Sequence, residues 1–206
     1  MSTVSASWSG LPLETAEQWF KDPIQTIDVT LTGVFSPTAD GACPVCFDGT
    51  RSAFVKPRPG PENKLLVARE KISSDLAYLL GLPVAPVVVR CPMAPDWPNY
   101  TAMSLVVSSS ARLWGAGGDK HIAIAAEILE HLRVFWTWIG DTDHNNHPGN
   151  LLFMVNGSKI ELCAIDHAFT LCRQCHPDPL AVPACTGYGT VTLSGREAWT
   201  RAQIAK

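Results

Sequence analysis

The stretch that decides the fold runs from Trp136 to Leu171 and reads WTWIGDTDHNNHPGNLLFMVNGSKIELCAIDHAFTL. It predicts the end of a helix, a polar loop, two short apolar strands and a second acidic loop. Asn156-Gly157 is expected as the hairpin turn between the strands. The polar loop gathers many side chains of one kind within ten positions: Asp141, Asp143, His144, Asn145, Asn146, His147 and Asn150.

Asp166 is the residue that points from this pattern to chemistry. It directly follows Leu-Cys-Ala-Ile, where a carboxylate is costly to bury unless it holds a cation. An Asp early in a loop, an Asn further on and a second Asp after a hairpin are typical of phosphoryl transfer. There, the first Asp orients the attacking hydroxyl, and the other two side chains hold Mg²⁺ against the phosphates.

Composition excludes several function classes. The chain has 206 residues, enough for one domain or two small lobes, and a net charge of −3 that argues against a nucleic-acid partner. No stretch approaches the roughly eighteen apolar residues of a membrane span, and the first residues lack the features of a signal peptide. We therefore expect no membrane span, a cytoplasmic location, and cysteines that are thiols rather than disulfides.

The first half of the chain predicts a small sheet with one helix. Residues 1–23 are interpreted as an N-terminal extension with a short helix from Leu13 to Phe20. A meander of three antiparallel strands, one helix capped by Asn63 and two further strands then follow, at residues 24–35, 43–48, 52–56, 64–80, 84–90 and 100–107.

The second half predicts a helical unit that carries the polar loops. Residues 108–118 are small and polar, which is typical of a linker, and Asp119 is expected to cap a helix that ends near Ile139. Ser194 could cap a last helix. The expected fold is α+β, a compact bilobal protein-kinase-like arrangement with an antiparallel-sheet N-lobe and a small helical C-lobe, at residues 24–107 and 108–206.

Lys56 and Glu70 fit the same interpretation. In kinases a Lys on the third strand contacts the ATP phosphates and pairs with a Glu of the next helix. Lys56 ends the third predicted strand, and Glu70 lies beside the apolar stripe of the helix that follows. Two solvated charges are the alternative. Gly41, in the turn after the first strand, would let backbone N–H groups approach a phosphate.

The histidines and cysteines also allow the alternative interpretation that the protein binds a metal. His144, His147 and His167 beside acidic residues also suit a metal-dependent hydrolase, although that function would not account for Lys56 or Glu70. Two CxxC spacings are compatible with zinc or with plain thiols: Cys43–Cys46 and Cys172–Cys175, the latter with Cys163 and Cys185 nearby.

Several of these segments together resemble HipA-like kinases, a group that is itself similar to phosphoinositide 3- and 4-kinases. The segments are SAFVKP, ARE, LLGLPVAP, GDTDHNNHPGNLLF and AIDHAFTL, within residues 28 to 172. The resemblance implies a bilobal kinase fold with ATP- and Mg²⁺-dependent transfer of a phosphoryl group to a hydroxyl, most often of a protein serine or threonine. A small-molecule hydroxyl is the other acceptor class.

The resemblance also implies roles for individual residues. Lys56 would contact the phosphates and Glu70 would hold it, Asp143 would be the catalytic Asp that positions the hydroxyl, and Asn150 and Asp166 would bind the metal. The adenine would lie near a hinge formed by Met103, Ser104, Leu105 and Val106.

Three departures from the family pattern keep alternatives open. Asp143 and Asn150 are seven positions apart, against roughly five in the kinase pattern, so Asn145 or Asn146 could replace Asn150, or Asp141 could replace Asp143. About 35 residues follow Leu171, fewer than a full helical lobe, so a partner protein could complete the C-lobe. The N-terminal domain of full HipA toxins is also absent. A nucleotide-binding module without transfer activity therefore stays a second reading.

Overall fold

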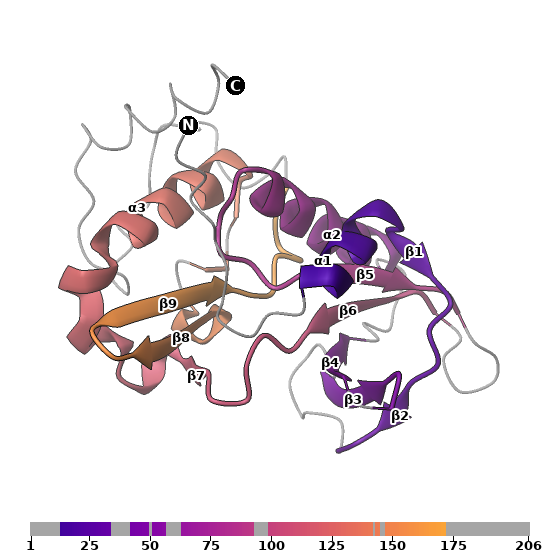
Figure 1. The fold of residues 1–206 in the computed structure, drawn as a ribbon. Coiled ribbons are helices and arrows are strands. Elements are labelled where there is room, and N and C mark those ends of the chain that lie inside the picture. Colours follow the sequence, from indigo (N-terminus) through magenta and orange to yellow (C-terminus); the bar gives the residue numbers. More distant parts are fainter. Residues whose placement is uncertain are drawn as a thin grey trace.

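The structure, a computed structural model, describes residues 13–33, 42–49, 51–56, 63–92, 99–141, 143–144 and 147–171. Within these residues the fold is α+β, as predicted (Figure 1). Its first part holds two helices and six strands: α1 (Leu13–Lys21), β1 (Ile24–Gln25), β2 (Thr30–Leu31), β3 (Cys43–Phe47), β4 (Arg51–Lys56), α2 (Asn63–Leu79), β5 (Val87–Arg90) and β6 (Thr101–Leu105).

The second part of the described chain holds one long helix, three short 3₁₀ turns and a small sheet. Its elements are β7 (Arg112–Leu113), η1 (Trp114–Ala116), η2 (Gly118–His121), α3 (Ile122–Trp138), η3 (Pro148–Asn150), β8 (Leu151–Asn156) and β9 (Lys159–Ala164). The predicted Ser194 helix lies outside the described residues. None of the helices that the structure describes is long and apolar enough to cross a membrane.

The six strands of the first part form one sheet in the order β1-β5-β6-β4-β3-β2. The predicted meander is confirmed for β2, β3 and β4, which pair antiparallel. The single strand predicted over residues 24–35 is wrong. Its two ends pair at opposite edges of the sheet, β1 parallel to β5 and β2 antiparallel to β3. Between them Ile27 and Val29 pack on the apolar core of the sheet, so the alternating pattern reflects a crossing segment rather than one strand.

Side chains alternate between two apolar layers across this sheet. Val55, Val88 and Met103 face one side, where Trp19 of α1 fills the layer. The neighbouring residues Val87, Val89 and Ala102 face the other side, where they meet Val67 of α2. This alternation is the two-residue period of a strand, and it leaves Lys56 of β4 on the face that α2 covers.

The second part of the chain is not purely helical, because β7, β8 and β9 form a second antiparallel sheet. The segment predicted as a linker contributes β7 to this sheet and also forms η1. Asn156 pairs with Lys159, so the hairpin turn is Gly157-Ser158, one position later than predicted, with Gly157 at φ 61°. The expected Asp119 cap is also wrong. Asp119 lies inside η2, and α3 begins after His121 without a side-chain cap.

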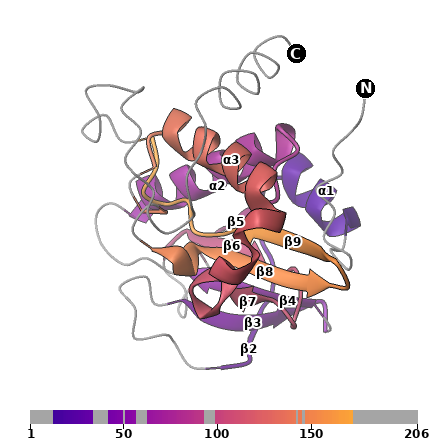
Figure 2. The ribbon, with the colours of Figure 1, turned by 90° about the vertical axis from the view of Figure 1, so that its left-hand side faces the viewer.

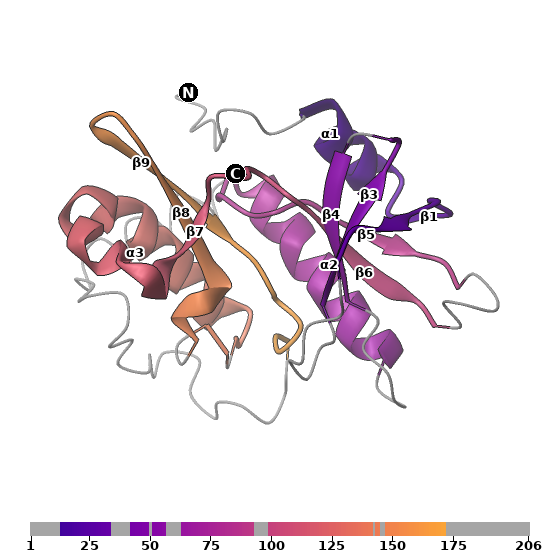
Figure 3. The same ribbon diagram turned by 90° about the horizontal axis from the view of Figure 1, so that it is seen from below.

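Backbone hydrogen bonds join the small sheet to the segment that leads into β5 of the large sheet. The N–H of Ala85 donates to the carbonyl of Ala164 (3.0 Å), whose own N–H donates to Pro83 (2.9 Å). In Figure 2 the three α-helices lie above the strands. Figure 3 shows the small sheet and α3 on one side, the six-stranded sheet and α1 on the other, and α2 between them. The end of β9 is thereby fixed against the segment that leads into β5.

Candidate active site

Lys56, Glu70 and Asp166 meet where the two sheets approach each other. The Lys56 Nζ atom lies 2.9 Å from Glu70 Oε1 and 3.0 Å from Asp166 Oδ1. Glu70 is fully buried, and its side chain sits on the inner face of α2, where the Ser104 hydroxyl also donates to it at 3.5 Å. Because the Lys56 and Asp166 side chains are only 9% and 15% exposed, this contact is a largely desolvated ion triad rather than a surface pair.

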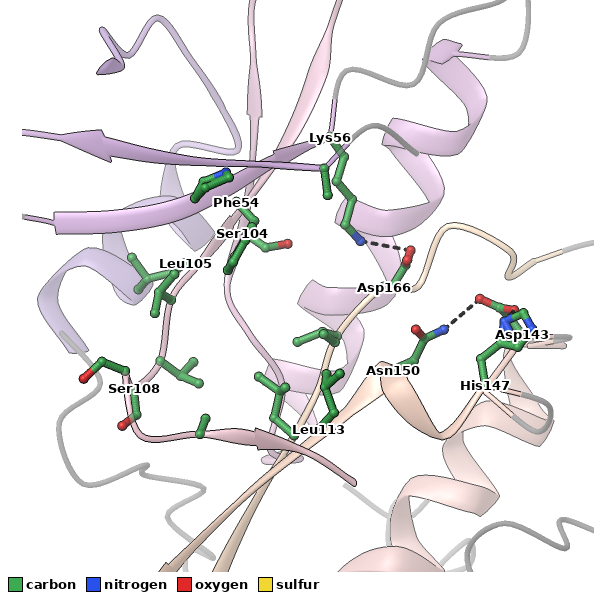
Figure 4. A pocket seen from close by; sticks show the side chains of 18 of the residues that line it. Phe54, Lys56, Ser104, Leu105, Ser108, Leu113, Asp143, His147, Asn150 and Asp166 are labelled. Atoms are coloured by element: carbon green, nitrogen blue, oxygen red, sulfur yellow. Dashed lines mark hydrogen bonds and ion pairs between the residues drawn. The ribbon is translucent and has the colours of Figure 1, made fainter. Parts of the chain in front are cut away.

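Asp143 and Asn150 form the second half of the site. The Asn150 Nδ2 atom donates to Asp143 Oδ2 at 2.7 Å, and the two contacts drawn in Figure 4 place this pair beside Lys56 and Asp166. His147, whose side chain is 64% exposed, approaches Asp143 Oδ1 with its Nδ1 at 2.7 Å. The longer loop between Asp143 and Asn150 thus still brings the two side chains into contact.

Asp141 has a different environment from Asp143. It is 4% exposed and accepts hydrogen bonds from the N–H groups of Asp143 (2.9 Å) and His144 (2.8 Å), and from His144 Nδ1 (2.8 Å). Burial acts to raise the pKa of Asp141, but the His144 charge and the hydrogen bonds from His144 outweigh it, so the pKa lies below its ordinary value. Asp141 therefore shapes the loop, and Asp143 is the acid that faces the cavity.

His144 braces the polar loop against the second acidic loop. Its Nε2 lies 2.9 Å from the carbonyl of Ile165, the residue before Asp166, and its ring stacks on Trp136 with 4.4 Å between centroids. The Asp141 carboxylate faces Nδ1 and the Ile165 carbonyl faces Nε2, so both ring nitrogens of His144 lie against acceptor oxygens. Sequence reasoning did not predict the contact between Asp141 and His144. The spacing of an Asp and a His three positions apart in the polar loop was its only signal.

The backbone at Asp166 is unusual. Its φ of 63° lies in the left-handed region, which Asp tolerates better than most residues but which still needs support from its surroundings. Part of that support precedes it, because the N–H of Ile165 donates to the carbonyl of Asn150 at 2.9 Å. Asn150 and Asp166, the residues proposed to hold a metal, both line the cavity, and this backbone hydrogen bond also holds their two segments together.

A cavity of about 1160 Å³ opens between the two sheets and contains these polar groups at one end. Ser104, Leu105 and Val106 of the predicted hinge line it. Met103 does not, because its side chain points to the opposite face of the sheet, into the apolar layer with Trp19. Apolar side chains of both sheets and of the segments after β6 and β9 form most of the other walls: Pro44, Phe54, Val107, Leu113, Leu152, Ile165 and Phe169.

The donor set fits Mg²⁺ better than a softer metal. The Asn150 amide nitrogen is engaged by Asp143, which leaves its oxygen for a cation, and Asp166 supplies a carboxylate beside the cavity. Within the described residues no three His, Cys, Asp or Glu side chains group in a way that could hold a metal ion. The histidines considered for a hydrolase centre are engaged or buried. Burial and the nearby His144 charge lower the pKa of His167 to about 3, so it is a neutral core residue.

Other predicted site residues separate or lie outside the described part of the chain. Cys43 and Cys46 are three positions apart on β3, so their side chains point to opposite faces and do not form a zinc pair. Burial raises the pKa of the Cys43 thiol. The remaining predictions fall on residues that the structure does not describe: Gly41, Asn145, Asn146, Cys172, Cys175 and Cys185.

Comparison with known proteins gives distant structural similarity only. No protein-family model matches the chain, and no curated protein is significantly similar to it. A Helicobacter pylori proinflammatory kinase, CtkA, is similar at 15% identity and a TM-score of 0.49, over 72% of this chain and 60% of that one. WaaP, in a complex with acyl carrier protein, is similar at 15% identity and a TM-score of 0.44, over 97% and 85%. This chain thus spans 60% of the length of CtkA, and at these scores neither similarity assigns a function or singles out HipA-like kinases.

Proposed function

We propose that the protein is an ATP- and Mg²⁺-dependent phosphotransferase whose acceptor is a hydroxyl, in the first place that of a protein serine or threonine. One observation carries the proposal. Lys56 lies between Glu70 and Asp166 at the rim of the same cavity into which the bonded pair Asp143 and Asn150 projects. A Lys held by a helix Glu, an Asn and Asp for a metal, and a separate Asp are the parts that phosphoryl transfer to a hydroxyl requires.

Each residue has a task that its position supports. Lys56 would contact the phosphate oxygens, and Glu70 would keep its ammonium group at the cavity. Asn150 and Asp166 would hold Mg²⁺, which supplies neutralisation of the charge on the phosphates when bound. The apolar walls formed by Phe54, Leu105, Leu113 and Leu152 suit the faces of an adenine ring.

Asp143 would orient the acceptor and take its proton. Each carboxylate oxygen offers two lone pairs, so Asp143 can accept from Asn150 and His147 and still receive a hydroxyl. The acceptor oxygen would form a bond to the γ-phosphorus as the bond from that phosphorus to the β–γ bridging oxygen breaks. The hydroxyl proton would pass to Asp143, and ADP would leave.

Transfer of labelled γ-phosphate tests this proposal. The wild-type protein is incubated with labelled ATP and Mg²⁺, and phosphate on the protein, on added serine- and threonine-containing peptides and in solution is measured separately. We expect Asp143→Ala to reduce transfer by about 10²- to 10⁴-fold, the usual contribution of a positioned acid or base, with little change in nucleotide affinity. Asp119→Ala, which removes an exposed acid outside the cavity, is the matched control.

Two outcomes would change the proposal. Wild-type turnover by Asp143→Ala would remove that residue from the chemistry. Binding of Mg-ATP by the wild type without transfer to protein, peptide or water would instead favour a nucleotide-binding module that lacks transfer activity. A partner protein that completes the C-lobe is part of the same proposal, and transfer that appears only after addition of a cell extract would support it.

A further inference from the structure

A buried chain of hydroxyl groups joins α2 to the loop that carries Asp166. Ser73 Oγ and Thr170 Oγ1 are 2.7 Å apart, and both side chains are fully buried. Thr170 Oγ1 also donates to the carbonyl of His167 at 2.8 Å. A hydroxyl has one proton, so Thr170 cannot donate twice and Ser73 must donate to it. The chain of hydrogen bonds therefore runs from Ser73 through Thr170 to His167.

These two hydrogen bonds connect the same two elements as the ion triad of the site. Ser73 follows Glu70 by one turn of α2, and Thr170 follows Asp166 by four residues. The triad links Glu70 to Asp166 through Lys56 at the cavity, and the hydroxyl chain links α2 to the Asp166 loop behind it. One link is charged and open to a ligand, whereas the other is neutral and closed to solvent.

The left-handed backbone of Asp166 explains what the hydrogen bonds from Ser73 through Thr170 to His167 could do. A residue in that region keeps its conformation only when its surroundings fix it, and the loop at Asp166 has φ 63°. The hydrogen bond from Thr170 to His167 closes the turn that directly follows Asp166. Ser73 then holds this turn against α2 through its hydrogen bond to Thr170, with or without a bound ligand.

We propose that Ser73 and Thr170 are positioning residues that set the place of the Asp166 carboxylate relative to Lys56 and Asn150. Their effect on metal binding rests on the proposed function, whereas their effect on the loop does not. Loss of the link should loosen residues 166–171 and raise the Mg²⁺ concentration at which nucleotide binds. It should not change the fold of either sheet.

The protein contains a matched control for the hydrogen bond between Ser73 and Thr170. Ser74 is the next residue of α2, is 1% exposed, and donates to the carbonyl of Ala85 at 2.9 Å. Ser74→Ala thus removes a hydrogen bond that is also donated by a buried serine of α2, but one that ends at a backbone carbonyl in the segment before β5. Thr170→Val removes the hydroxyl at nearly constant volume, and Thr170→Ser retains it.

Hydrogen exchange of the free protein tests the link to the loop. We expect amides in residues 166–171 to exchange about fivefold faster in Ser73→Ala and Thr170→Val, the factor that corresponds to one net hydrogen bond. Ser74→Ala and Thr170→Ser should leave this segment unchanged. Equal exchange in Ser73→Ala and Ser74→Ala, after correction for global stability, would overturn the inference. If Ser73→Ala does not fold, Thr170→Val against Thr170→Ser decides the same question.

Thermal stabilisation by nucleotide tests the effect on the site. At fixed ATP, the Mg²⁺ concentration for half-maximal stabilisation should rise about fivefold in Ser73→Ala and Thr170→Val, and stay at the wild-type value in the two controls. An altered loop with unchanged Mg²⁺ dependence would overturn the inference, because the loop would be held without setting the site. If the wild type itself shows no stabilisation by Mg-ATP, the proposed function fails, and hydrogen exchange alone decides whether the link exists.

Discussion

The two acids of the polar loop should respond in opposite ways to the same substitutions. Asp141 accepts three hydrogen bonds and is almost completely buried, whereas Asp143 faces the cavity. Asp141→Ala leaves two backbone N–H groups and the His144 ring without their acceptor. Breaking such a buried charged pair costs about 3–5 kcal/mol of unfolding free energy, a large part of the roughly 5–15 kcal/mol of an ordinary domain.

Asparagine at position 141 should restore most of this loss. Its oxygen can still accept from the N–H groups of Asp143 and His144, and its NH₂ group can donate to Nδ1 of a neutral His144. His144 would then keep its Nε2–H bond to Ile165. We expect Asp141→Asn to cost about 1 kcal/mol, near the net value of one hydrogen bond.

Asp143 should show the reverse pattern. Its side chain is 16% exposed and has two hydrogen-bond partners, one of them solvent-exposed, so Asp143→Asn should change stability by about 1 kcal/mol or less. Phosphoryl transfer should fall as far as in Asp143→Ala, because an amide cannot take the acceptor proton. Urea unfolding and a transfer assay on all four variants measure both effects. An active Asp143→Asn, or an Asp141→Ala as stable as Asp141→Asn, would refute the reasoning.

Three further expectations follow from single contacts. The folded-state pKa of Asp141 lies below its ordinary value of 3.8. Its contribution to stability is therefore complete above pH 3.8 and is lost as the pH falls through the lower folded-state pKa. In urea unfolding, the difference in unfolding free energy between wild type and Asp141→Ala should narrow only below about pH 4. Lys56→Met should lower unfolding free energy by about 3 kcal/mol, because buried Glu70 loses its cationic partner at 2.9 Å, and should abolish thermal stabilisation by Mg-ATP; an unchanged shift would argue against a phosphate contact. Gly118→Ala should cost about 1–3 kcal/mol in thermal unfolding, because the new methyl group would overlap the Trp114 ring, whereas Gly149→Ala, which meets no atom within 4 Å, is the control.

The parts of the site that the sequence could predict are those set by element order. Lys56 ends a strand, Glu70 lies on the next helix and Asp166 follows a hairpin. The Lys56–Glu70 pair is expected from this order, whereas the Lys56–Asp166 contact is not. The general α+β fold is set in the same way. These predictions depend on local periodicity and on which elements are neighbours along the chain, both of which the sequence shows directly.

The parts that it could not predict depend on tertiary contacts. Asp141 and Asp143 are two residues apart in one loop, and the structure buries Asp141 against His144 while Asp143 lines the cavity. The segment between β1 and β2 has the alternation of a strand, yet it crosses the sheet, where Ile27 and Val29 pack on the apolar cluster that contains Trp19. Ser73 and Thr170 are separated by 97 positions in the chain, and no local pattern marks either of them.

The central claim, that the cavity binds a nucleotide through Lys56, Asn150 and Asp166, is tested most directly by melting temperature. The wild-type protein is melted with ATP alone, with Mg²⁺ alone and with both. At a nucleotide concentration tenfold above the dissociation constant, we expect a rise of about 3–6 °C with both ligands, from a binding free energy of about 1.4 kcal/mol, and little change with either alone. No rise with both ligands at millimolar concentrations would contradict the claim.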